Sequence, residues 1–155
     1  MKKALSVFLS AALCLSLVGC GTKYEDTNGA DNFKLQTITD QNIIKRDIGA
    51  SGLAYTEEDL AGVLSSSEYS SKNFNGVEQI FLTNFLLPSD IEIYVGHMNV
   101  KSGNFRLAVI NNDEIIYEIP LDSFAETFRF EDLTGTFSIH VAGESAAFNF
   151  HLNVI

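Results

Sequence analysis

The sequence predicts an all-β protein, an antiparallel β-sandwich of the immunoglobulin-like kind, preceded by a short N-terminal helix and a flexible tether. From Gly76 onward, apolar and polar residues alternate with a period of two, which is typical of strands that bury one face. The alternating stretches are short, and turn residues separate them at intervals of about 8 to 12 residues. This spacing favours a sandwich or barrel over a helical or mixed fold.

The first twenty residues follow the order of charge and hydropathy found in a secretory signal. Lys2 and Lys3 precede an uncharged, mostly apolar run from Ala4 to Leu17. As a helix this run would span about 21 Å, less than the ~30 Å hydrocarbon core of a membrane. A removed signal is therefore favoured over a permanent transmembrane helix. The run leads into Leu17-Val18-Gly19-Cys20, which resembles the lipobox of bacterial lipoproteins.

This resemblance implies a lipid anchor at Cys20. Residues 1–19 would be cleaved as a signal peptide, and the Cys20 thiol would carry a diacylglyceryl group, with a further acyl chain such as palmitate on the new amino terminus. Two or three acyl chains give stable attachment, because a single chain binds a membrane only marginally. The resemblance therefore implies a protein anchored to the cell membrane on its extracytoplasmic side, at the cell surface. It implies no cofactor besides this covalent lipid.

Composition limits the partners of the mature chain. The signal peptide would remove two of the ten basic residues and no acid, leaving eight basic and twenty acidic residues, a formal charge of −12. Nucleic acids and anionic headgroups attract basic proteins, so neither is an expected ligand. Cys14 would leave with the signal and Cys20 would be acylated. No thiol would then remain for a disulfide, a zinc site or a nucleophile.

Four segments are expected along the chain. Residues 1–19 are the signal peptide, residues 20–32 a polar, flexible tether, residues 33–75 a mixed segment and residues 76–155 the sandwich domain. In the mixed segment, weak alternation between residues 33 and 48 indicates a strand.

A short helix is expected near residues 57–65. Thr56 resembles a helix cap, and the acids Glu57, Glu58 and Asp59 would fill the first turn. The sequence leaves open whether the mixed segment joins the sandwich or lies over it.

Alternation places the strands of the expected sandwich. They are expected at residues 91–95, 105–109, 115–119, 127–130, 137–141 and 148–154. The second and third strands suit a hairpin in which Val109 pairs with Ile115 across a three-residue loop, residues 111–113. Asn and Asp tolerate the left-handed backbone that such loops require.

The last two strands predict a second hairpin, which places two histidines. Val141 opposite Phe148, across a turn at residues 143–146, keeps apolar side chains together on one face. His140 and His151 would then be diagonal neighbours on the outward face. Two solvated histidines are the favoured interpretation, because a shared metal ion needs further ligands and none has matching spacing.

The C-terminal part, from about Tyr69 to Ile155, resembles small β-sandwich lipoproteins of unknown function from Gram-positive bacteria. The segments VKSGNFRLAV, DLTGTFSIHVAGESAAF and FHLNVI carry this resemblance. It implies a fold and a location and brings no site with it.

Two functional hypotheses follow. The first is a non-catalytic binding or structural module for a protein or glycan partner in the cell envelope. The second is an envelope hydrolase or metal-binding protein that uses the outward histidines, His140 and His151. Sugar-binding sandwiches stack rings on Trp or Tyr. The chain has no Trp, so Tyr94 is the weak aromatic candidate for such a surface site.

Overall fold

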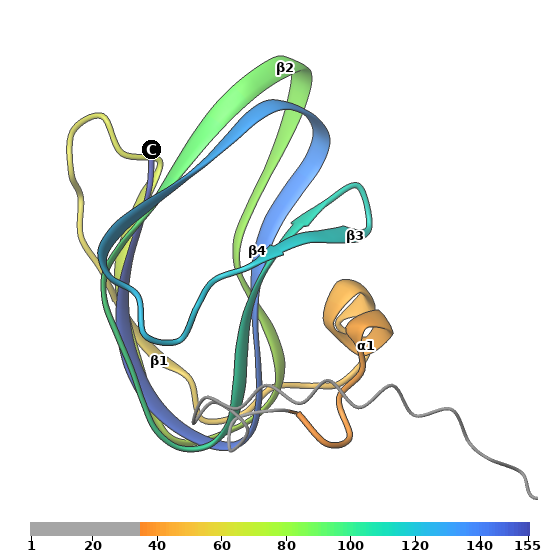
Figure 1. The fold of residues 1–155 in the computed structure, drawn as a ribbon, viewed down its shortest axis with the longest axis vertical. Helices are drawn as coiled ribbons and strands as arrows, with labels where there is room; N and C mark the ends of the chain where they lie inside the picture. The colour runs from red at the N-terminus through yellow and green to blue at the C-terminus, as the bar shows by residue number, and fades with distance from the viewer. Residues whose placement is uncertain (1–34) are drawn as a thin grey trace, which may run out of the picture.

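A computed structural model describes residues 35–155, which form two curved antiparallel layers packed face to face (Figure 1). The predicted all-β antiparallel sandwich is confirmed. Within the described residues no helix is long and apolar enough to cross a membrane. The elements are, in chain order, α1 (Asp40–Lys45), β1 (Ala54–Glu57), β2 (Ser65–Asn111), β3 (Glu114–Glu118) and β4 (Phe124–Val154).

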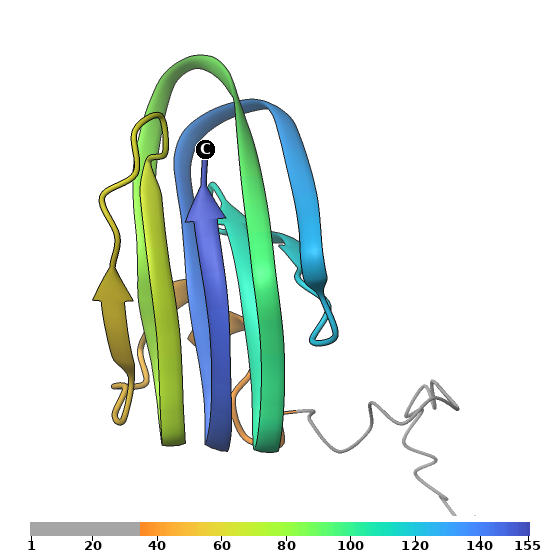
Figure 2. The same cartoon turned by 90° about the vertical axis from the view of Figure 1, so that its left-hand side faces the viewer.

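The strands β2 and β4 are much longer than the expected short strands, because each runs through both layers. Residues 137–154 of β4 lie between two parts of β2, residues 65–83 on one edge and residues 93–111 on the other. The paired strands arch over one end of the sandwich (Figure 2) and bend again at the other end (Figure 1). Breaks in register mark the bends, since a bulge lets a strand turn without losing its partner.

The two layers can be defined by these segments. The first layer contains β1, residues 65–71 and 93–100 of β2, and residues 147–154 of β4. The second layer contains residues 76–85 and 104–111 of β2, residues 136–143 of β4, and β3.

The predicted hairpin that turns at residues 143–146 is wrong. β4 continues through this stretch, and Phe148 pairs with Ser71 and Val100 rather than with Val141. Both halves of β4 bury the residues assigned to the core, so alternation was right while pairing was not. A period of two tells which face a residue occupies, but not which strand lies beside it. Turn residues such as Gly143 and Ser145 also suit a bend within a strand.

The predicted register of the hairpin between β2 and β3 is also wrong. Its loop has two residues, Asn112 and Asp113, both with positive φ (47° and 63°), as two-residue hairpin loops require. Val109 then pairs with Tyr117, because a shift in register follows at Ile110. That bulge keeps apolar side chains opposite one another. The predicted register reached the same match with a three-residue loop instead.

The main core between the layers is rich in aromatic rings. The rings of Phe105 and Phe148 lie 4.4 Å apart between centroids, and Phe150 stacks on Tyr69 at 4.9 Å. All four side chains are buried. Burying a large apolar side chain is worth about 1.5–3 kcal/mol, so these rings contribute strongly to the stability of the sandwich.

A second, smaller core lies on the outside of the second layer, under α1. Ile43 of the helix is fully buried there, and the cluster also contains Ile38, Val77, Ala108, Ile110 and Ala142. Figure 1 shows α1 beside this layer, outside the sandwich. The part of the layer under α1 is therefore buried on both faces.

Within the described residues 35–48, the predicted strand is wrong, because the segment forms α1 and irregular backbone. Thr39 caps the helix and forms a capping box with Asn42, while Arg46 ends it in the left-handed conformation. The cap signal Thr-x-x-Asn was present in the sequence. A capping box with Asn in place of Glu or Gln is the weaker form of the signal.

The helix predicted near residues 57–65 is wrong too. β1 covers Ala54–Glu57 and pairs antiparallel with Ser67–Ser70 of β2. Residues 58–64 form an irregular connection in which Gly62 has φ +81°. Residues 54–57 pair with the open edge of β2 instead of starting a helix, because a short isolated helix has only marginal stability. The sandwich therefore includes part of the mixed segment.

Candidate functional site

The structure separates the predicted histidines. The lipidation site predicted at Cys20 lies outside the described residues. His140 sits in the second layer and is 3% exposed, whereas His151 sits in the first layer and is partly exposed. Their predicted closeness depended on the hairpin at residues 143–146, which the structure does not form. A metal or catalytic site that combines His140 with His151 therefore has no geometric basis.

His140 is a buried neutral group that helps to hold α1. Its Nδ1 lies 2.7 Å from the carbonyl oxygen of Ile43, which can only accept, so Nδ1 carries the proton and donates. Its Nε2 is buried and has no partner among the described residues. Burial lowers the pKa of His140, and the nearby charge of Arg46 lowers it further, although the hydrogen bond to Ile43 opposes this.

The lowered pKa of His140 predicts a stability loss on mild acidification. The unfolded chain takes up a proton at pH values where the folded chain resists it. This contribution to stability is therefore complete above about pH 6.5, the unperturbed pKa of histidine. It is lost as the pH falls from there through the lowered pKa of folded His140. We expect His140→Leu to reduce the difference between the free energies of unfolding at about pH 7.5 and about pH 5.5. Urea titrations at both pH values measure these free energies of unfolding. A difference equal to that of the wild type would contradict a buried, neutral His140.

His151 belongs to a polar cluster on the outer face of the first layer. Its ring stacks on that of His97, with centroids 6.5 Å apart. His97 Nε2 lies 3.1 Å from Glu68 Oε1 and 3.0 Å from Asn149 Nδ2. One nitrogen cannot donate to the carboxylate and accept from the amide at once, so Nε2 bonds one or the other, depending on the tautomer of His97. Within residues 35–155, no group of three or more His, Cys, Asp or Glu side chains could hold a metal ion.

Tyr94 shares this outer face with His151. Tyr94 pairs in register with Asn153, and His151 lies two residues before Asn153 on the same side of β4. Tyr94 is half-buried. The structure thus brings two of the three predicted surface residues onto one face, and it adds Glu68 and His97, which the sequence analysis missed.

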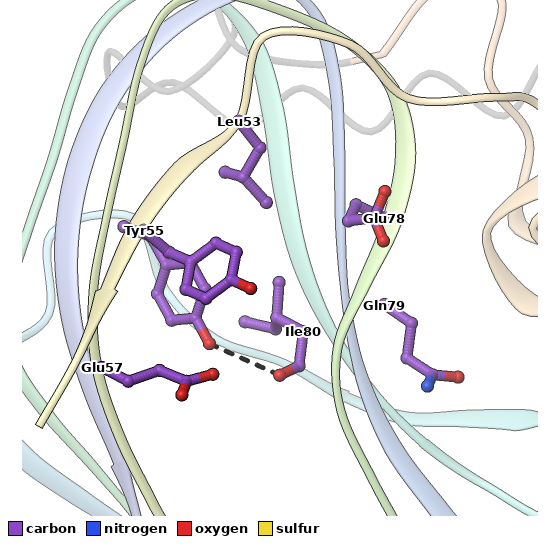
Figure 3. A pocket seen from close by; sticks show the side chains of 7 residues that line it. Leu53, Tyr55, Glu57, Glu78, Gln79 and Ile80 are labelled. Atoms are coloured by element: carbon purple, nitrogen blue, oxygen red, sulfur yellow. Dashed lines mark hydrogen bonds between the residues drawn. The ribbon is translucent and has the colours of Figure 1, made fainter. Parts of the chain in front are cut away.

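A hollow opens at the edge of the sandwich, between β1 and the second layer. Its volume is about 390 Å³, within the range of about 300–1,000 Å³ for ligand sites. Figure 3 shows Glu57 and Glu78 on opposite sides of it, with Tyr55 and Ile80 between them. The lining residues are Leu53, Tyr55, Glu57, Tyr69, Glu78, Gln79 and Ile80.

Tyr69 fixes the inner wall of this hollow. It is 4% exposed, its ring stacks on Phe150, and its hydroxyl donates to the carbonyl oxygen of Ile80 at 3.4 Å. Burial raises the pKa of Tyr69, and the Glu57 carboxylate adds to this effect. The phenol therefore stays neutral and keeps its proton for hydrogen bonding.

A second hollow, of about 490 Å³, lies beyond Glu57, which lines both. Ser66 is one of its lining residues, and the Ser66 hydroxyl is buried in the protein with no hydrogen-bond partner among the described residues. Its lining consists of Glu57, Glu58, Asp59, Leu64, Ser65 and Ser66.

Both hollows are acidic and lack a basic lining residue. Carboxylates beside an exposed tyrosine face can bind a cation, through ion pairs and through the negative face of the ring. Glu57, Glu58 and Asp59 match the pattern of a helix start, which is why the sequence alone does not reveal this site. The signal that could have found it is the aromatic Tyr55 directly before Thr56 and the acids, a pattern that suits a strand as well as a cap.

Comparisons with known proteins add little to this geometry. No model of a protein family matches the chain, and no curated protein matches it. Among solved structures, the chain is similar to the crystal structure of a cupin superfamily protein from Desulfitobacterium hafniense, with 10% sequence identity and a TM-score of 0.34. The match covers 79% of this chain and 93% of the other. A likeness of this size supports no argument about the site.

Proposed function

We propose that this chain is a bacterial lipoprotein, anchored by Cys20 to the extracytoplasmic side of the cell membrane. Its sandwich is a non-catalytic binding module for a protein or glycan partner in the cell envelope. The observation that carries the anchor is the sequence Leu17-Val18-Gly19-Cys20 at the end of a short apolar run. The aromatic and acidic hollow beside β1 supports the binding role, because it offers a recessed surface of ligand size.

Replacing Cys20 tests the anchor. We expect the wild-type chain to partition into detergent and to incorporate an alkyne-labelled fatty acid in the expressing bacterium. Cys20→Ala should lose both properties, since the acyl chains supply nearly all of the membrane affinity. Mass spectrometry of the wild-type protein should find residues 1–19 removed.

The chain offers a matched control in its other cysteine. Cys14→Ala removes a thiol within the predicted signal peptide and should leave fatty-acid labelling and partitioning unchanged. Finding residues 1–19 intact, with no acyl mass on Cys20, would refute the lipoprotein assignment.

A further inference from the structure

We infer that the two hollows beside β1 form one groove, and that its ligand is an extended basic peptide segment of the envelope partner. This inference rests on the proposed binding function and specifies its ligand class. Glu57, the last residue of β1, lines both hollows, so they lie next to each other at the end of β1. We call them together the β1 groove.

The charge of the groove indicates that its ligand is positively charged. Glu57 and Glu78 line the first hollow, Glu57, Glu58 and Asp59 line the second, and neither contains a basic side chain. None of these acids forms an ion pair with another residue in the part of the chain that the structure describes. A cationic ligand would relieve this local repulsion, whereas an anionic one would increase it.

The aromatic wall suits the same ligand. Tyr55 is 61% exposed, and its ring lies 6.1 Å from that of Tyr69 between centroids. An ammonium or guanidinium group over an exposed tyrosine face gains about 0.5–1 kcal/mol. A guanidinium can also pair with a carboxylate through two parallel hydrogen bonds. The first hollow therefore fits an arginine or lysine side chain.

The free edge of β1 favours an extended peptide over a compact cation. β1 ends the sheet and pairs only with β2, so its other edge has no strand beside it in the described chain. An extended peptide can add to such an edge through main-chain hydrogen bonds, while its side chains enter pockets. The two hollows would each take one basic side chain of that peptide.

Binding of labelled peptides to the full acylated chain in detergent tests the inference. The probe is a fluorescent peptide with alternating arginine and serine, compared with the same peptide carrying glutamate for arginine. We expect only the basic peptide to raise the fluorescence anisotropy. Glu57→Gln with Glu78→Gln should weaken its binding roughly 10-fold, and Tyr55→Ala roughly 3-fold.

The matched control is Glu126→Gln with Glu131→Gln, the same change in charge at two exposed positions of β4. It should leave the affinity within about two-fold of wild type. Equal weakening by both double variants would mean non-specific attraction and would overturn the inference.

Nuclear magnetic resonance locates the ligand independently of affinity. The amide signals of Tyr55, Glu57 and Ile80 should shift when the basic peptide is added. Shifts confined to other residues would overturn the inference, as would binding of a neutral oligosaccharide in the groove with no binding of the peptide. Neither result would affect the fatty-acid labelling at Cys20, so failure of the ligand assignment is distinguishable from failure of the proposed lipoprotein.

Discussion

Phe150→Ala should destabilise the sandwich by about 3–5 kcal/mol, the usual cost of removing a buried phenylalanine. Phe150 is 0% exposed and stacks on Tyr69, and its ring also lies 5.7 Å from that of Phe148 and 6.0 Å from that of Phe105. Small domains are stable by only about 5–15 kcal/mol, so the variant would lose a large share of its stability. Thermal unfolding followed by circular dichroism should show a midpoint lower by roughly 10–20 °C.

The same substitution at Phe124 is the matched control. Phe124 is 77% exposed, so Phe124→Ala should change the free energy of unfolding by less than about 0.5 kcal/mol. If Phe150→Ala melted at the wild-type temperature, the inward assignment of the last strand would be refuted.

Phe150 also links the core to the β1 groove. Its ring supports Tyr69, whose hydroxyl holds the carbonyl group of Ile80 in the wall of the hollow. A cavity at Phe150 would therefore loosen the wall as well as the core. Peptide binding and stability should fall together in this variant, whereas in Tyr55→Ala binding should fall alone.

The fold class could be predicted from the sequence because the pattern of burial is local. Phe137, Ile139 and Val141 alternate, and so do Phe148, Phe150 and Leu152, and all six are buried as expected. Burial of alternate residues needs no knowledge of the neighbouring strand.

Strand pairing could not be predicted in the same way. β4 finds partners in two distant parts of β2, and the choice between these and a local hairpin depends on how the whole sheet closes. The sequence at residues 143–146 suits a turn and a bend equally well. His140 does lie on the outward face of β4, as alternation predicted, but it is buried because α1 covers that face.

The candidate site was missed for a related reason. The first hollow of the β1 groove lies between β1 and residues 78–80 of β2, which belong to different layers. No spacing along the chain reveals that Glu57 and Glu78 lie on opposite sides of one hollow. The helix α1 was missed because its stripe of apolar residues is short, and its position depends on contacts with distant residues.

One of these distant contacts is a carboxylate that fastens the start of the described chain to the bend in β4. Glu144 accepts hydrogen bonds from the backbone N–H groups of Gln36 (2.7 Å), Thr37 (2.6 Å) and Ile38 (3.0 Å). It also accepts from the hydroxyl of Thr37 at 2.7 Å and from the side-chain amide of Asn104 at 3.1 Å. These bonds hold the segment that leads into α1.

Arg106 links the start of α1 to β3. Its Nη1 lies 2.6 Å from Asp40 Oδ1, at the start of the helix, and its guanidinium also pairs with Glu118 of β3. Together with the Glu144 contacts, Arg106 holds α1 and the segment before α1 against β3 and β4.

The pKa of Glu144 shows how firmly the carboxylate is held. Partial burial raises the pKa, but the hydrogen bonds from Gln36, Thr37 and Ile38 outweigh burial and lower it from 4.5 to about 2. Because the folded pKa is depressed, the stabilisation is complete above about pH 4.5 and is lost as the pH falls towards about 2. Acidification to about pH 3 should therefore leave the contact largely formed.

Glu144→Gln should release this segment at neutral pH. The amide offers one acceptor oxygen in place of two and turns an N–H₂ group towards backbone donors, so the variant should lose about 1–3 kcal/mol. Amide hydrogen exchange at Thr37 and Ile38 should become faster by roughly 10-fold or more, while exchange in the core around Phe150 should change little. Glu131→Gln, the same substitution at an exposed position of β4, should leave both regions at the wild-type rate. Unchanged protection of Thr37 and Ile38 in Glu144→Gln would show that packing of Ile38 and Ile43 alone holds the segment, and that the carboxylate is dispensable.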